Sequence, residues 1–398
     1  MIKETMTSRQ RVYRAMRHLP TDRVPIDLGS HFSTGINGFA YHRLREYLGL
    51  PTERLPAQRL PTQRLPAQRG EGVEIATLRW FLARVDEDVL RRFHCDCMLL
   101  APSWEPMKTW AYDERTRFRI PAALDTYQNE TGNWCLAENG EGRLVIDRDT
   151  REIYPEGKGS RYFNAMTDLA VMATHAEQIF KETEYAAFAQ GPGAIYHNNP
   201  DWLCRLVLEP DEMRAVIDAQ MKGILEHVGE MIRRMGEYVQ GYVIGSDLGT
   251  QRGPYINPAL YEALIAPAIR ELCSFIHRNS DMKVVMHSCG AIRPFIPIFI
   301  DCGIDVLNPV QISAVDMEPE ALKRDFGSDI VFWGGGCDTQ HVLGTGTPAD
   351  VADNVRHLMS VFKPGGGYVF NQVQDIVANV PSENIVTMLD TAYAESFY

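Results

Sequence analysis

Short apolar runs alternate with longer amphipathic stretches from residue 241 to the C-terminus. A buried parallel strand appears in a sequence as a short apolar run, whereas an amphipathic helix repeats its apolar positions every three to four residues. The pattern predicts strands at 241–245, 283–287, 304–308, 329–334 and 367–371. It predicts helices near 258–279, 291–302, 316–326, 347–362 and 381–396.

Three earlier apolar runs resemble these strands, at 24–28, 95–100 and 186–190. Together the runs predict an α/β fold in which eight strands and their intervening helices form a (β/α)8 TIM-type barrel, with a helical segment at the N-terminus. The alternative is an open doubly wound sheet. That fold would place a Gly-x-Gly-x-x-Gly turn after an early strand, and the sequence has none.

Two insertions interrupt the barrel, which we expect to be a single domain over residues 1–398. Residues 101–180 are rich in Tyr, Thr, Gly and charged residues, and turn signals at Asn139-Gly140 and Gly157 predict β-hairpins there. Residues 50–69 repeat the pattern Leu-Pro-x-x-Arg. A proline in every five residues prevents a continuous helix, so we expect an extended surface segment without a function of its own.

The composition excludes several classes of protein. Forty Lys and Arg residues against 52 Asp and Glu residues give a net charge of −12, which disfavours a nucleic-acid-binding protein. No apolar run is long enough for a membrane span, which needs about 18 residues, and the N-terminus lacks the apolar core of a signal peptide. The eight cysteines are scattered, which favours free thiols and a cytoplasmic location.

Polar residues follow the proposed strands, where the chemistry of such barrels takes place. Asp27 and His31 follow the first strand, and Asp247, Gln251 and Arg252 follow the strand at 241–245. The other proposed strand ends carry Gln190, His197, His287, Cys289, Asn308, Gln311, Cys337, Asp338, Gln340, Asn371, Gln374 and Asp375.

His287, Cys289 and Cys337 form a candidate three-ligand zinc site. His287 and Cys289 are two residues apart, so they point to the same side where the strand ends. An imidazole with two thiolates favours Zn²⁺ over Mg²⁺ or Ca²⁺, and three protein ligands leave a fourth position open, as in catalytic zinc sites. The alternative is that both cysteines pack beneath tight glycine-rich loops.

Glycine triplets at 334–336 and 365–367 flank the last two proposed strands. Loops at this position in such barrels often bind phosphate through backbone N–H groups, and we take Gly335, Gly336 and the nearby Asn371 as candidate cofactor-binding residues. Tight turns and close backbone approach explain the glycines equally well.

Several sequence blocks resemble one known group of proteins. They are TSRQRVYRAMRHLPTDRVPIDLG at the N-terminus, GSDLGTQRGPYINP at 245–258, HSCGAIRPFIP at 287–297, DVLNPVQ at 305–311 and FWGGGCDTQHVL at 332–343. Over residues 7–50 and 180–396 the chain resembles the uroporphyrinogen decarboxylase superfamily, and within it the methyltransferase branch related to methylcobamide:coenzyme M methyltransferases. The resemblance implies that zinc is bound by His287, Cys289 and Cys337, and that the corrinoid cofactor is carried by a partner protein.

The resemblance therefore implies a zinc-dependent methyltransferase that moves a methyl group between a corrinoid protein and a small methyl donor or thiol acceptor. We assign Asp247, Gln311 and Asp27 to the catalytic group and leave a homodimer open. The chain departs from related sequences at Gln374, where those sequences often have His.

Two alternatives stay open. The first is a cofactor-free decarboxylase of the uroporphyrinogen decarboxylase type. It is disfavoured because the opening DLGSHFSTGINGF lacks the arginines that a polycarboxylated substrate needs. The second is a non-catalytic barrel that binds a corrinoid or another tetrapyrrole. Catalytic turnover of a substrate would exclude this non-catalytic alternative.

Overall fold

The computed structural model describes residues 4–51, 71–101, 106–138, 142–157, 168–193, 195 and 199–398. Nearly all of the Leu-Pro-x-x-Arg repeat lies outside the described residues, as do the Asn139-Gly140 turn and His197.

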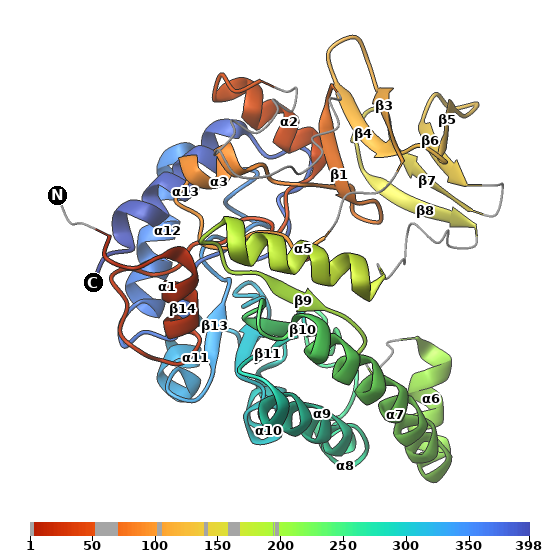
Figure 1. Ribbon diagram of the computed structural model, residues 1–398, viewed down its shortest axis with the longest axis vertical. Coiled ribbons are helices and arrows are strands. Elements are labelled where there is room, and N and C mark those ends of the chain that lie inside the picture. Colours follow the sequence, from red (N-terminus) through yellow and green to blue (C-terminus); the bar gives the residue numbers. More distant parts are fainter. Residues whose placement is uncertain are drawn as a thin grey trace.

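A six-stranded parallel sheet forms the centre of the molecule (Figure 1). Its strands lie in the order β14-β13-β12-β11-β10-β9. Their bounds are β9 Phe188–Gln190, β10 Gly241–Gly245, β11 Lys283–His287, β12 Val306–Asn308, β13 Val331–Trp333 and β14 Tyr368–Val369. Each overlaps a predicted strand. Gly245 pairs with His287 and His287 pairs with Asn308, so the carboxyl ends of three neighbouring strands lie at one level.

Single-residue bridges link the two edges of this sheet. Ile26 pairs with Phe370 beyond β14, and Cys97 pairs with Ala186 just before β9. The backbone N–H of Asp96 donates to the Ile26 carbonyl at 2.7 Å, which joins the two linking segments. The predicted strands at 24–28 and 95–100 are thus reduced to bridges. One reason is that the backbone N–H of Ile26 donates to the Asp96 carboxylate. A longer strand pairing would need that N–H for a backbone carbonyl.

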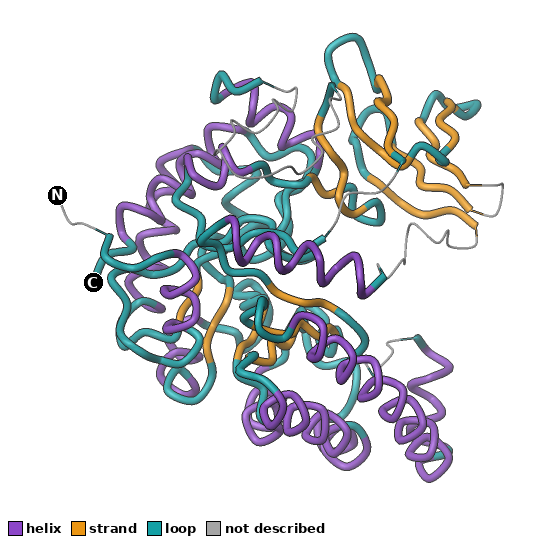
Figure 2. Tube along the Cα trace, in the orientation of Figure 1, coloured by secondary structure: helices purple, strands orange, loops and turns teal. Residues whose placement is uncertain are grey.

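Helices lie along the outside of the sheet (Figure 2). Those after β9 are α6 Pro200–Leu208, α7 Pro210–Met235, α8 Pro258–Leu264, α9 Ala266–Asn279, α10 Ile296–Cys302, α11 Pro319–Phe326, α12 Pro348–Phe362 and α13 Ser382–Glu395, with a 3-10 turn at Arg293–Phe295. The predicted helix at 258–279 is divided in two at Ile265, because Pro267 in the first turn of α9 cannot continue the preceding helix.

The N-terminal part adds three short helices. They are α1 Ser8–Ala15, α2 Gly38–Tyr47 and α3 Glu87–Arg92. The Thr7 side chain and Gln10 form a reciprocal capping box at the start of α1, so the helical segment expected at the N-terminus is present.

Two further four-stranded sheets lie to one side of the central sheet (Figures 1 and 2). The first has the order β2-β1-β4-β3 and contains β1 Val73–Thr77, β2 Leu82–Ala83, β3 Met107–Ala111 and β4 Arg117–Pro121. The second is fully antiparallel and contains β5 Asp125–Gln128, β6 Trp134–Glu138, β7 Gly142–Ile146 and β8 Ile153–Gly157. Antiparallel hairpins lie within 101–180, the first of these two sheets begins earlier, at Val73, and helix α5 Leu169–Glu182 follows the hairpins.

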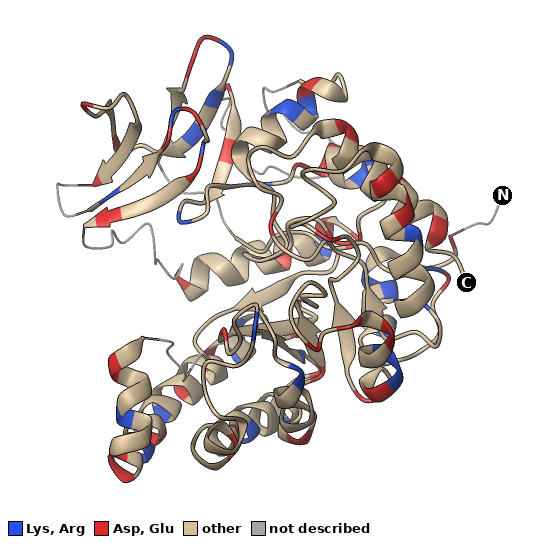
Figure 3. Ribbon diagram, turned by 180° about the vertical axis from the view of Figure 1, so that it is seen from behind, with Lys and Arg blue, Asp and Glu red and all other residues tan. Residues whose placement is uncertain are grey.

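Residues of both charge signs are interspersed along the outer helices and the hairpins (Figure 3). Among the described residues, no helix combines the length and the apolar character that crossing a membrane requires.

Candidate metal centre

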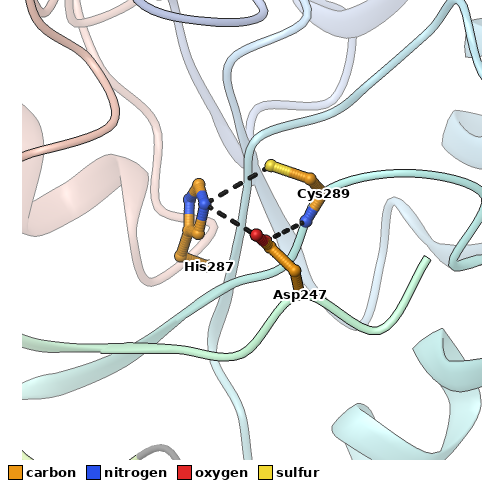
Figure 4. A group of neighbouring side chains, drawn as sticks. All are labelled: Asp247, His287 and Cys289. Atoms are coloured by element: carbon orange, nitrogen blue, oxygen red, sulfur yellow. Dashed lines mark hydrogen bonds and ion pairs between the residues drawn. The ribbon is translucent and has the colours of Figure 1, made fainter. Parts of the chain in front are cut away.

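Three potential metal ligands meet where β10 and β11 end. They are Asp247, His287 and Cys289, whose donor atoms all lie within 4.8 Å of one another (Figure 4). His287 is the last residue of β11, and Cys289 follows two residues later on the same side. Asp247 follows the end of β10, whose Gly245 pairs with His287. The parallel register of two neighbouring strands therefore builds this donor group.

His287 presents one ring nitrogen to the other two donors. Its Nε2 lies 3.5 Å from the Cys289 Sγ and 3.6 Å from the Asp247 Oδ1. Its Nδ1 lies 2.9 Å from the Oδ1 of Asn308, an atom that can only accept a hydrogen bond. The proton is therefore on Nδ1, and the lone pair of Nε2 faces the donor group.

Asn308 is itself held in place from both sides. Its Nδ2 donates to the Trp333 carbonyl at 3.1 Å, which fixes which end of the amide faces His287. The Ser33 hydroxyl donates to the same Oδ1 at 3.1 Å. Burial lowers the pKa of His287, so the ring is neutral at neutral pH and suited to binding a metal ion.

Cys289 lies between Asp247 and Gln374. Its backbone N–H donates to the Asp247 Oδ1 at 3.0 Å, and its Sγ lies 3.3 Å from the Gln374 Nε2, which donates to it. Burial and the nearby Asp247 carboxylate raise the pKa of the thiol to about 12. Without a cation, this sulfur carries its proton at neutral pH. A metal ion would release that proton.

Gln311 stands beside the donor group and not in it. Its Oε1 accepts from the Gly290 N–H at 2.8 Å and from Gln374 at 3.3 Å, and its Nε2 donates to Gln251 at 2.8 Å. These contacts use the amide to brace the loop that carries Cys289.

Cys337 is described by the structure but does not join the donor group. Its side chain is fully buried in the main apolar core, and burial raises the pKa of its thiol. Gly334 and Gly335 adopt positive φ angles of 107° and 71° directly before it. The structure thus brings together two of the three ligands expected from the sequence, and Asp247 supplies the third donor.

Asp27, assigned to the catalytic group, is entirely buried. Its carboxylate accepts from the Ser30 hydroxyl at 2.9 Å and from the Trp333 indole N–H at 3.2 Å, and burial raises its pKa to about 6. Trp333 links it toward the donor group, because the Trp333 carbonyl accepts from Asn308, whose Oδ1 is paired with His287.

The glycine triplet at 334–336 packs against the neighbouring strand. The Gly336 N–H donates to the Asn371 carbonyl at 2.8 Å, and a Cβ on Gly336 would lie 2.4 Å from the Phe370 ring. The Asn371 amide donates to the Asp27 carbonyl at 3.0 Å. Gly336 and Asn371 therefore take part in strand packing, and Gly335 lies against Val310, whereas their expected part in cofactor binding stays a prediction.

The donor group suits zinc by its chemistry. An imidazole nitrogen, a thiolate sulfur and a carboxylate oxygen are all established zinc ligands, and the sulfur disfavours Mg²⁺ and Ca²⁺. Sequence reasoning listed Asn308 only as a strand-end residue and did not single out Ser33, Phe32 or Trp80 near the site. Nothing in the local sequence marks the contacts that they make.

The family model for uroporphyrinogen decarboxylase (URO-D) matches residues 187–394, which is more than half of the 398 residues. The chain belongs to the uroporphyrinogen decarboxylase family. The matched region begins just before β9 and contains the whole donor group. No curated protein sequence matches the chain significantly.

One solved structure supports the fold of this family member. A methyltransferase from Methanosarcina mazei aligns with a TM-score of 0.56 at 12% identity, covering 98% of this chain and 99% of that one. This likeness and the family together imply a TIM-barrel fold. A vitamin-B12-independent methionine synthase from Listeria monocytogenes aligns at a TM-score of 0.33 and 14% identity over 55% of this chain and 68% of that one. A D-psicose 3-epimerase aligns at a TM-score of 0.34 and 13% identity, over 57% of this chain and 80% of that one.

Proposed function

We propose that this chain is a zinc-dependent methyltransferase that moves a methyl group between a small substrate and the corrinoid of a separate protein. The observation that carries the proposal is the group of Asp247, His287 and Cys289 at the ends of two parallel strands. The family and the fold of the Methanosarcina methyltransferase are consistent with it.

The residues of the chain would prepare the site for the metal ion. His287 offers Nε2 because Asn308 holds the proton on Nδ1, and Gln374 donates a hydrogen bond to the Cys289 sulfur. Asp247 is 45% exposed, so its carboxylate lies on the open side of the group. When bound, zinc would supply a Lewis acid that polarises the heteroatom carrying or receiving the methyl group.

The transfer itself is a displacement, so alignment of donor and acceptor matters most. The corrinoid protein is then a substrate that docks at the carboxyl ends of the strands. The first side sheet reaches this region, because Trp80 in the turn between β1 and β2 stacks on Phe32 beside His287. We assign part of the docking surface to this sheet.

The proposal is tested by metal content and methyl transfer in cysteine variants. Cys289→Ser is expected to lose both bound zinc and transfer of a methyl group to a corrinoid protein. Cys337→Ser is the matched control, because it removes the thiol that follows β13 without touching the donor group. Equal zinc loss in both variants would contradict this ligand set. Full activity of the wild type after exhaustive chelation, on a carboxylated ring compound, would favour the decarboxylase instead.

A further inference from the structure

A cavity of about 1170 Å³ lies at the opposite end of the central sheet from the candidate metal centre. Its lining includes Glu184, Gln240 and Asp281, which come before β9, β10 and β11, whereas the donor group comes at the ends of β10 and β11. Most of the other lining residues belong to α1 or lie at the C-terminal ends of α5, α7 and α9. The proposed methyl transfer does not use this cavity.

The chain itself binds a cation in the wall of this cavity. The C-terminal end of a helix carries partial negative charge, because its last carbonyl groups have no partner within the helix. At the end of α5, the Arg9 guanidinium donates to the carbonyls of Phe180 at 3.0 Å and Thr183 at 2.7 Å. Its Cζ lies 4.2 Å from the centre of the Phe180 ring. A helix end in this wall can therefore hold an organic cation.

The ends of α9 and α7 differ in how their carbonyl groups are paired. At α9, the side chains of Asn279 and Ser280 donate to carbonyls one turn earlier, at 2.7 and 2.9 Å. At α7, the two arginines of the last turn, Arg233 and Arg234, pair with Glu230 instead. In the described parts of the chain, no side chain donates a hydrogen bond to the carbonyls of this last turn. The end of α7 is therefore open to a cation from outside the chain.

Two carboxylates at the cavity also have no cation beside them. Glu237 follows α7, Asp281 follows α9, and both are exposed. Lys181 and Arg234 pair with other carboxylates, and no described Lys, Arg or His forms an ion pair with either of these two. Arg14, which also lines the cavity, donates to a backbone carbonyl at 2.6 Å. The uncompensated charge of the lining is therefore negative, which favours a cationic ligand.

We propose that this cavity binds a small aliphatic dication, an alkyl chain with an ammonium or guanidinium group at each end. One end lies at Glu237 and the end of α7, in the way that Arg9 lies at the end of α5, and the other end pairs with Asp281. The methylene groups pack on Ile232 and Val239, which add apolar surface to the lining. An anion would meet two carboxylates and three helix C-termini, so the same cavity disfavours it.

The inference is independent of the proposed function, because the two sites lie at opposite ends of the sheet. Neither Glu237 nor Asp281 contacts the donor group of Asp247, His287 and Cys289. Substitutions at the cavity are therefore expected to leave bound zinc unchanged.

The test measures binding of agmatine, a butyl chain with one ammonium and one guanidinium group, to the full-length protein by calorimetry at low ionic strength. Glu237→Gln and Asp281→Asn are each expected to weaken binding about threefold, the scale of one exposed charge pair, and the double variant about tenfold. Both side chains are exposed, so the variants are expected to fold. Asp353→Asn, at an exposed carboxylate of α12 outside the cavity, is the matched control expected to change nothing. Butylamine, which has one charge, should bind more weakly than agmatine.

Three results would overturn the inference. They are no saturable binding of agmatine, equal agmatine affinity in the double variant and the wild type, and tighter binding of inorganic phosphate or Mg²⁺ than of agmatine. Zinc content is measured in every variant. Loss of agmatine binding with zinc retained would confirm that the cavity and the donor group are separate sites.

Discussion

The Oδ1 of Asn308 accepts the Nδ1 proton of His287 at 2.9 Å, and this one contact decides which ring nitrogen faces Cys289 and Asp247. Asn308 comes from β12 and His287 from β11, and the two residues are paired in register. The sheet therefore sets the tautomer of the imidazole before any metal ion arrives.

Asn308→Ala is expected to weaken zinc binding by about 10- to 100-fold, the usual effect of removing a residue that orients a metal-binding histidine. Titration against a coloured chelator measures it. Asn384→Ala is the control, since Asn384 is buried and bonded to two carbonyls elsewhere in the fold. Equal zinc affinity in Asn308→Ala and the wild type would show that Asn308 does not orient His287 for metal binding.

Zinc affinity is expected to rise with pH. The Cys289 thiol has its pKa raised to about 12 by burial, so it must release one proton when a metal ion binds. The neutral His287 releases none, because its pKa is lowered. The apparent association constant should therefore increase about tenfold per pH unit above pH 7, as measured by competitive titration. A flat profile in the wild type would speak against a protonated resting thiol.

Asp27 is expected to make the folded state less stable as the pH rises. Burial raises its pKa from an ordinary 3.8 to about 6, so the folded state binds more protons than the unfolded state between these values. The contribution is fully present below pH 3.8 and is lost as the pH rises through 6. A shift of this size corresponds to about 3 kcal/mol.

Asp27→Asn removes the ionisable group, and with it the loss of stability at rising pH. The asparagine amide keeps an oxygen that can accept hydrogen bonds from Ser30 and Trp333. Its free energy of unfolding relative to the wild type should increase from pH 4 to pH 7, as measured by urea titration at each pH. Asp353→Asn, at a carboxylate that is 79% exposed, should show no such trend. A constant difference for Asp27→Asn would mean that the carboxyl group is already ionised when buried.

Gly336→Ala is expected to destabilise the fold by roughly 1–3 kcal/mol, because the added Cβ would lie 2.4 Å from the Phe370 ring and 2.9 Å from the Asn371 carbonyl oxygen. Gly223→Ala in helix α7 is the control, since nothing lies within 4 Å of its Cβ position. That change should raise the melting temperature slightly. Thermal unfolding of both variants without ligand measures this effect. An unchanged melting temperature in Gly336→Ala would mean that Gly336 has no packing role.

Sequence spacing indicates only those positions of the candidate site that depend on neighbouring strand ends, although it assigned Asp247 to the catalytic group and not to the metal ligands. His287 and Cys289 share a face because they are two residues apart, and Asp247 follows the adjacent strand end. Cys337 could not be placed in the same way. The positive φ angles of Gly334 and Gly335 turn the chain before it, so its direction depends on backbone angles that spacing does not reveal.

The fold shows the same division between local and long-range information. The strands and helices from residue 241 onward follow from periodicity. The segments at 24–28 and 95–100 form only bridges, partly because a buried Asp96 side chain takes a backbone N–H that the strand pattern assigned to a neighbour. The approach of Trp80 to Phe32 joins two different sheets, and no spacing along the chain could have indicated it.

X-ray absorption at the zinc edge of the purified, zinc-loaded protein tests the central claim most directly. The donor group of Asp247, His287 and Cys289 predicts one sulfur near 2.3 Å and otherwise nitrogen or oxygen near 2.0–2.2 Å. The Cys337→Ser variant should give the same spectrum. Two sulfur ligands in the wild type, falling to one in Cys337→Ser, would contradict the account, since zinc would then be bound by a thiol that the described structure buries in the core.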